Sequence, residues 1–476
     1  MKRPVLFILL SFAAWLPPAA FAKTTGPQQV AHPAKVRDLP EICRSHVLRV
    51  LVNQSRNSSG VVGGQPIGVE DLRLKAFENY LASPAGGGQK VTVKLIPKAK
   101  EQLLAALLRG EGDLVAPGEA MEPTQLETVA GTVAGSEPTV GRAPLVLVSA
   151  RGARRYSHPE QLAGKVLVLP AGSAAGGALA TLNERLALRH LAPVRIEWVD
   201  PSLAVEDVLE MVEAKVYPLT LVEQPIAERW ANVMPKLQIN RQVAFAAAAG
   251  MRWYTRPPAV QLQASVDAFL KGYQAPADHD KAFVKVYAPL YKIHNPLAAR
   301  GRARLEDLRP VLQRNAQQQG LDWLDLAALA YKESALDPGA RGTSGATGLL
   351  QITPSAAARV GVGGIHELDN NVKAGARYLA MIKRKFFASR QLAERERMAF
   401  TLAAYNLGPE RVQALRAEAR RRGLNPNQWF FQVERVAQEQ MGMATVSYVN
   451  AVNKYFLAYD RERDNLEPPG QRVALR

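Results

Sequence analysis

The pattern of apolar residues changes near residue 300, and this change most constrains how the chain folds. From about residue 40 to 274, short valine- and leucine-rich runs, such as VLRVLV at 47–52 and VTVKLI at 91–96, alternate with segments of helical pattern. From residue 305 onwards, apolar residues recur at spacings of three and four. The first pattern is typical of an α/β domain with mostly parallel sheets, and the second predicts amphipathic helices. At 476 residues the chain is also too long for one ordinary core, so we expect two domains.

The expected domain boundaries follow from these patterns and from composition. They are a signal peptide at 1–22, an α/β domain at 40–274, a linker at 275–304, a mainly α-helical domain at 305–460 and a tail at 461–476. In the second domain, helices are expected at 305–317, 323–334, 371–386, 396–405, 410–422 and 444–459.

The N-terminus has the pattern of a secretory signal. Lys2 and Arg3 precede an apolar run that ends at Leu16, and Ala20-Phe21-Ala22 provides a small-residue cleavage site. Spanning a bilayer takes about 20 apolar residues, and two prolines interrupt this run early. We therefore expect cleavage after Ala22 and a periplasmic protein, with peripheral association to the outer membrane left open.

The charge of the chain narrows the class of partner. The net charge is +17, which attracts anionic polymers and surfaces. Export argues against nucleic acid, so an anionic envelope surface or a wall polymer fits better. The seven histidines show no metal-ligand spacing beside carboxylates, and no calcium-loop motif is present. We therefore expect neither a metal nor another cofactor.

One glutamate stands out in the segment ALAYKESALDPGARGTSGATGLLQ at 328–351. Glu333 ends an apolar helical segment, and burial there raises the pKa of a carboxyl and suits it to act as a general acid. Asp337 precedes Pro338-Gly339 and is better explained as a turn former. From the residues alone, Glu333 is either this acid or a capped surface glutamate.

Three motifs resemble a known family, and this resemblance favours the hypothesis that Glu333 is a general acid. Glu333-Ser334, GTSGATGLLQITPSAA at 342–357 and AAYNLG at 403–408 resemble the soluble lytic transglycosylase domain, which has a goose-type-lysozyme-like fold. The resemblance implies cleavage of the β-1,4 bond between N-acetylmuramic acid and N-acetylglucosamine in peptidoglycan glycan strands. Glu333 would act as acid and then as base, and the C6 hydroxyl of the muramyl sugar would attack its own anomeric carbon to give a 1,6-anhydro product. A second carboxylate is then not required.

The same resemblance implies roles for five further side chains. Ser344 and Gln351 would bind sugar hydroxyl and acetamido groups, Tyr405 would lie near Glu333, Asn406 would contact substrate, and Tyr448 would line the cleft. For each of them, a purely local structural role is the alternative.

The first domain resembles the family 3 solute-binding proteins, two α/β lobes around a cleft. The resemblance rests on the order of GVEDLRLKAFENYLA, LLAALLRGEGDLVAPG, APLVLVSA, GKVLVLPAGSAAGGAL and LTLVEQPIAERW. Where amino-acid binders of that family have a carboxylate-binding arginine, this chain has Gln125, which lacks the charged fork. Gly172-Ser173 at a helix start offers backbone N–H groups to a peptide or small anionic ligand, or is an ordinary turn. The domain is thus expected to sense a ligand and to regulate the second domain.

Two alternative functions remain. A hydrolytic muramidase would need a carboxylate that activates water, for which Asp369 is the candidate. A noncatalytic wall-binding or sensor protein would use the helical domain only to hold glycan.

Overall fold

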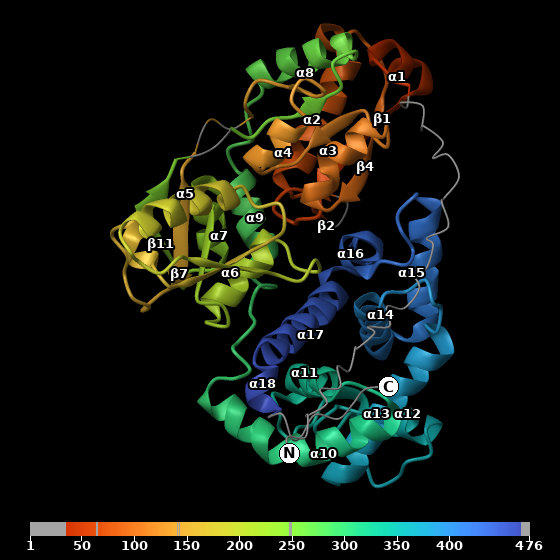
Figure 1. Ribbon diagram of the computed structural model, residues 1–476. Coiled ribbons are helices and arrows are strands. Elements are labelled where there is room, and N and C mark those ends of the chain that lie inside the picture. Colours follow the sequence, from red (N-terminus) through yellow and green to blue (C-terminus); the bar gives the residue numbers. More distant parts are fainter. Residues whose placement is uncertain (1–34, 63–64, 140, 142, 247–249, 468–476) are drawn as a thin grey trace, which may run out of the picture.

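The computed structural model describes residues 35–467, apart from 63–64, 140, 142 and 247–249. The predicted signal peptide lies outside the described residues, as does residue 468 onwards of the predicted tail. Figure 1 shows two α/β lobes and a separate helical domain below them. The predicted fold class, a two-lobed α/β region followed by a mainly α-helical domain, is confirmed.

The first lobe is built on a five-stranded sheet in the order β4-β1-β5-β12-β6. Its strands are β1 (Val47–Asn53), β4 (Thr92–Lys98), β5 (Leu114–Ala116), β6 (Ala134–Gly135) and β12 (Tyr254–Thr255). Its helices are α1 (Leu39–Ser45), α2 (Val69–Ala82), α3 (Leu103–Leu108), α4 (Pro123–Thr128) and α8 (Val260–Gly272), with short 3-10 turns η1 (Pro84–Gly86) and η2 (Lys100–Gln102) and a small hairpin of β2 (Val61–Val62) and β3 (Gln65–Pro66). Strand β1 is parallel to β4 and β5, as its buried valines and leucines predicted.

The second lobe is inserted between β6 and β12 of the first. Its strands are β7 (Leu145–Ala150), β8 (Val166–Leu169), β9 (Arg195–Trp198), β10 (Leu219–Glu223) and β11 (Leu237–Phe245), and its helices are η3 (Pro159–Leu162), α5 (Ala175–Leu188), α6 (Val205–Glu213) and α7 (Gln224–Val233). Strand β7 pairs antiparallel with both β10 and β11, and among the described strands of this lobe β8 and β9 form the one parallel pair. The prediction of mostly parallel sheets is therefore wrong for this lobe, because alternation of strands and helices along the sequence does not fix the direction of pairing.

The helical domain contains all six predicted helices. These are α10 (Ala299–Gln319), α11 (Trp323–Ser334), α13 (Leu368–Phe386), α14 (Glu394–Leu407), α15 (Pro409–Arg421) and α17 (Met443–Arg461). The sequence did not predict the shorter elements η4 (Thr343–Gly345), α12 (Pro354–Arg359), the π-helix η5 (Trp429–Val433), α16 (Glu434–Met441) and α18 (Arg463–Leu466). Helix α11 begins where Asp322 accepts a hydrogen bond from the N–H of Leu324, and its buried leucine and alanine face packs in one core with α17.

The segment 275–304, predicted as a linker, joins the two domains and contains a helix of its own. Helix α9 (His279–Tyr287) places Phe283 and Tyr287 against Trp230 of α7, with ring centroids 5.0 and 5.5 Å apart. This segment is therefore packed onto the second lobe. The exact domain boundaries remain predictions.

Buried charged residues join both lobes to the helical domain. Arg56, in the loop after β1, lies 2.7 Å from Glu434 of α16 and 3.3 Å from Asp207 of α6. Lys454 of α17 lies 2.6 Å from Asp207 and 2.5 Å from Glu210 of the same helix α6. All five side chains are nearly inaccessible to solvent. Because unpaired buried charges are costly, these pairs favour one arrangement of the three parts.

None of the helices in the described part of the chain combines the length and the apolar character needed to cross a membrane.

Candidate functional site

Glu333 lies in the last turn of α11 and is half-buried. The helix stops directly after it, because Ala335 and Leu336 both adopt positive φ angles of 52° and 61°. The hydroxyl of Ser334 lies 2.9 Å from the carbonyl oxygen of Leu349, to which it donates. This bond fastens the end of the helix to the glycine-rich segment 342–351.

The carboxyl of Glu333 is held by a tyrosine from a distant helix. Tyr448 of α17 is 7% exposed, and its hydroxyl donates to Oε1 of Glu333 over 2.5 Å. Burial raises the pKa of Glu333, while the hydrogen bond from Tyr448 and the charge of Lys332 lower it, and the net effect is an increase. A carboxyl that keeps its proton to higher pH than usual is suited to protonate a leaving group.

Tyr405 lies near Glu333 but is bonded elsewhere. Its hydroxyl donates to the carbonyl oxygen of Leu350 over 2.9 Å, and its ring packs edge-on against Tyr378. Burial and the negative charge of Glu333 raise the pKa of Tyr405. The direct hydrogen-bond partner of Glu333 is thus Tyr448, which was predicted only to line the cleft.

The glycine-rich segment is fixed largely by its own contacts. The amide nitrogen of Gln351 donates to the carbonyl oxygens of Ala340 and Gly348 over 3.2 and 2.9 Å, so this group, predicted to bind sugar, holds the loop. Gly348 has a φ of 73°, and a Cβ there would lie 2.4 Å from Nδ2 of Asn371. Only glycine fits this close approach.

Asn371, in α13, is a structural residue that the sequence reasoning missed. Its side chain accepts from the N–H of Leu350 and donates to the carbonyl oxygens of Thr347 and Ile365, all within 2.9 Å. The sequence offered one indication of this role, because an asparagine at a buried position of a helix needs hydrogen-bond partners for both the oxygen and the nitrogen of its side chain.

The other two predicted substrate-binding residues are exposed. Ser344 stands in η4 with a φ of 56°, and Asn406 ends α14, where its Oδ1 accepts a 3.5 Å bond from Thr445. Glu333, Tyr405 and Tyr448 therefore lie close together, whereas neither Ser344 nor Asn406 makes a hydrogen bond with Glu333 among the described residues.

Asp369, the candidate carboxylate for a hydrolase, is engaged with α10. Its Oδ1 accepts from the guanidinium of Arg314 and, over 3.2 Å, from Asn315. These hydrogen bonds lower the pKa of Asp369. Within the described residues, it makes no hydrogen bond with Glu333 or Tyr448.

In the first domain, the two lobes meet across the expected ligand cleft. Gly172 has a φ of 71°, and a Cβ there would lie 3.0 Å from the backbone nitrogen of Glu101 in the other lobe. The N–H of Ala120 in the first lobe donates to Glu223 of β10 over 3.0 Å. The hydroxyl of Ser173 accepts from the N–H of Ala175, so the turn is partly satisfied by its own side chain.

Gln125 lies in α4, and its buried Oε1 has no hydrogen-bond partner within the described part of the chain. The position predicted to have lost a carboxylate-binding arginine therefore offers an acceptor rather than a cation.

The described residues contain no group of three or more histidine, cysteine or acidic side chains that could hold a metal ion.

Comparison with known proteins identifies the second domain. Residues 310–428 match the family model of the transglycosylase SLT domain. The chain thus carries a transglycosylase SLT domain behind a two-lobed α/β domain, and Tyr448 lies beyond the matched residues.

The chain is also similar to named proteins over most of its length. It is 25% identical over 391 residues to membrane-bound lytic murein transglycosylase F of Desulfosudis oleivorans, covering 80% of each chain. It is 28% identical over 379 residues to the protein of the same name from Ectopseudomonas mendocina, covering 75% of this chain and 74% of that one. The resemblance predicted from the motifs is confirmed.

Two solved structures align with about half of the chain. A substrate-binding protein of an amino acid ABC transporter from Streptococcus pneumoniae aligns with a TM-score of 0.38 at 16% identity, over 53% of this chain and 97% of that one. An ancestral arginine-binding protein aligns with a TM-score of 0.40 at 16% identity, over 50% and 97%.

Proposed function

We propose that this protein is a peptidoglycan lytic transglycosylase, which cleaves the β-1,4 bond between N-acetylmuramic acid and N-acetylglucosamine and leaves a 1,6-anhydromuramyl end. The observation that carries the proposal is a single half-buried carboxyl, Glu333, with a raised pKa and a tyrosine donor. The transglycosylase SLT domain that surrounds it and the names of the similar proteins support the same reaction.

Each step of the reaction can be assigned to this carboxyl. Protonated Glu333 gives its proton to the glycosidic oxygen as the bond from that oxygen to the anomeric carbon breaks. The resulting carboxylate then accepts the proton of the muramyl C6 hydroxyl while the oxygen of that hydroxyl bonds to the anomeric carbon. The hydrogen bond from Tyr448 stabilises the carboxylate between the two steps.

The intramolecular nucleophile accounts for the lone acid. A hydroxyl of the same sugar is held at an effective concentration that a free water does not reach, so no second carboxylate is needed to activate water. The position of Asp369, bonded to Arg314 and Asn315, is in line with this mechanism and disfavours the hydrolytic alternative.

The remaining predicted site residues take supporting roles in this proposal. Ser344 and Asn406 are exposed and would contact sugar groups. Gln351 and Tyr405 would instead hold the loop that shapes the cleft, by donating to the carbonyl oxygens of Gly348 and Leu350.

The first domain is proposed to sense a peptide or small anionic ligand in the cleft beside Gly172 and Ser173, and to regulate the second domain. Support comes from the buried charge pairs that connect α6 of the second lobe to α17. The protein would act in the periplasm, with peripheral attachment to the outer membrane. Its net positive charge would attract it to the anionic wall polymer and envelope surface found there.

The test is product analysis of purified sacculi digested by the wild type and by Glu333→Gln. Wild-type digests are expected to contain anhydromuramyl ends, and the variant, which cannot donate a proton, is expected to lose lysis by several orders of magnitude. Reducing ends in the wild-type digest would instead indicate a hydrolase, and undiminished lysis by Glu333→Gln would refute the assignment of the acid.

A further inference from the structure

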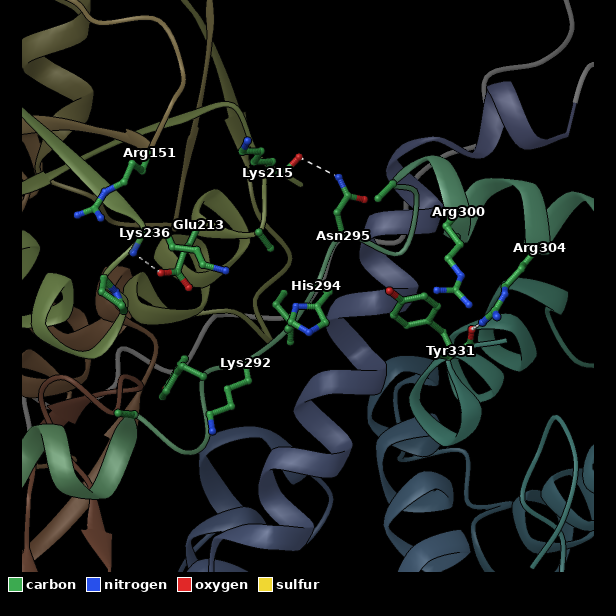
Figure 2. A pocket seen from close by; sticks show the side chains of 18 of the residues that line it. Arg151, Glu213, Lys215, Lys236, Lys292, His294, Asn295, Arg300, Arg304 and Tyr331 are labelled. Carbon is green, nitrogen blue, oxygen red and sulfur yellow. Dashed lines mark hydrogen bonds between the residues drawn. The ribbon is translucent and has the colours of Figure 1, made fainter. Parts of the chain in front are cut away.

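A large cavity lies between the second lobe and the helical domain, outside the site built on Glu333. Its volume is about 1600 Å³. Figure 2 shows that one wall comes from the second lobe, with Arg151, Lys215 and Lys236, and that the opposite wall comes from α10 and α11, with Arg300 and Tyr331. The segment after α9 runs between the two walls.

Among the charged residues that line the cavity, positive side chains outnumber negative ones. Six lysines and arginines face two carboxylates, those of Glu213 and Asp337. The six are Arg151, Lys215, Lys236, Lys292, Arg300 and Arg304. None of them forms an ion pair with a carboxylate of the described residues: Arg304 donates to the backbone oxygen of Ala335, and Glu213 accepts from the backbone N–H of Lys236. Side chains of one sign that converge on a concave surface concentrate the field there and attract ligands of the opposite sign.

The start of α10 adds a second, independent preference for an anion. The residue before the helix is Ala298, which has no side-chain acceptor for the first N–H groups, and no acidic residue stands in the first turn. Instead, Arg300 and Arg304 lie one turn apart near this end. The positive end of the helix dipole repels both guanidinium groups, and the two groups repel each other. An anion in the cavity would relieve both effects, since it would lie near the positive end of the helix dipole and beside the two guanidinium groups.

The wall formed by α11 connects the cavity to the proposed reaction. Tyr331, Ser334 and Ala335 line the cavity, and Glu333 lies in the same last turn of the helix, whose pitch is about 5.4 Å. Peptidoglycan carries short peptides with free carboxylates on its muramyl sugars. A branch of four residues extends up to about 14 Å, which exceeds the helix diameter of about 10–12 Å with side chains.

We propose that this cavity binds the carboxylates of the peptide branches of peptidoglycan, and so favours cleavage at muramyl sugars that carry a peptide. The inference rests on the proposed function, because it assumes that the glycan strand lies at Glu333. It goes beyond that function by assigning a second contact, made by the second lobe and α10 together, that selects the substrate.

The experiment measures binding without turnover. The probe is the free tetrapeptide Ala-Glu-diaminopimelate-Ala, titrated into the full-length mature chain, with the same peptide converted to carboxamides as the uncharged comparison. The variant Lys215→Gln/Arg300→Gln removes one cation from each wall. The matched control, Arg185→Gln/Lys271→Gln, removes two exposed cations on α5 and α8 that do not line the cavity.

The acidic peptide is expected to bind the cavity variant roughly tenfold more weakly than the wild type, because the variant lacks one cation on each wall, and the control is expected to match the wild type. Binding to the wild type should also weaken as salt is added. Equal affinity of the cavity variant and the wild type, or equal binding of the carboxamide peptide, would overturn the proposal. Circular dichroism and thermal unfolding show whether both variants are folded.

The two proposals fail separately. Normal peptide binding together with reducing ends in the sacculus digest would leave the cavity site standing and remove the lytic mechanism. Anhydromuramyl ends together with unchanged peptide binding by Lys215→Gln/Arg300→Gln would support the lytic mechanism and remove the cavity site.

Discussion

Removing one hydroxyl from Tyr448 should change the pH profile of lysis in a defined direction. In Tyr448→Phe, Glu333 loses the donor that lies 2.5 Å from its Oε1, while the buried ring stays in place. A hydrogen bond to a charged group contributes about 1.5–3 kcal/mol. Because Glu333 is only half-buried, we take the lower value, which corresponds to about one pH unit in the titration of the carboxyl.

The direction of the pH shift depends on which form of Glu333 the hydrogen bond from Tyr448 favours. Tyr448 stabilises the charged form and lowers the pKa of Glu333, so its loss raises that pKa further. The reaction begins with protonated Glu333, and the decline of lysis at alkaline pH reports its loss of that proton. This decline should therefore move to higher pH by about one pH unit in Tyr448→Phe, while the maximal rate falls because the carboxylate formed between the steps is less stable.

The assay is the rate of turbidity loss of purified sacculi between pH 4 and 9, with Tyr331→Phe as the control. Tyr331 packs against Tyr455 and makes no hydrogen bond to Glu333 among the described residues. An alkaline limb that stays in place or moves to lower pH in Tyr448→Phe would refute the assignment of this hydrogen bond to Glu333.

Two further substitutions test stability. Lys454→Met leaves the buried carboxylate of Glu210 without its cation and leaves Asp207 with Arg56 alone, so it should destabilise the fold by about 3–5 kcal/mol, seen as a lower midpoint of thermal unfolding; an unchanged midpoint would contradict the role of these pairs. Burial raises the pKa of Glu396 from 4.5 to about 7, so folding favours its protonated form and stability decreases as pH rises between those values. Glu396→Gln keeps an acceptor for the N–H of Trp429 and should reduce this pH dependence in urea unfolding, whereas a slope equal to that of the wild type would show that Glu396 is not its source.

The helical domain could be predicted closely because its helices are set by local periodicity. Segment 323–334 agrees with α11 at both ends, since Asp322 provides a cap and the apolar face repeats every three to four residues. Strand direction in the second lobe could not be predicted, because β7 pairs with strands that lie about 70 to 100 residues further along the chain. Helix α9 was missed among prolines and charges, although Phe283 and Tyr287 have the spacing of one helical face.

In the candidate site too, features set by local sequence could be predicted and long-range contacts could not. Glu333 could be named as a candidate from its place at the end of an apolar helix, but only the resemblance of the three motifs favoured the acid over a capped surface glutamate. Its contact with Tyr448 spans 115 residues and depends on how α11 and α17 pack. Likewise, Gln351 reads as a substrate residue in sequence, and only the fold shows its amide bonded inside the loop.

Helix α17 gives the regulatory role of the first domain a physical route. It carries Tyr448 against Glu333 and, six residues further on, Lys454 against Asp207 and Glu210 of α6. Six residues of helix rise only about 9 Å, and both side chains are buried, so this part of α17 moves as one body. A movement of α6 in the second lobe therefore either breaks the pairs with Lys454 or carries α17 with it, and in the second case the donor on Glu333 moves too. Glu333, the proposed acid, and the lobe expected to sense a ligand are thus connected through α17, which also packs with α11 in the helical core.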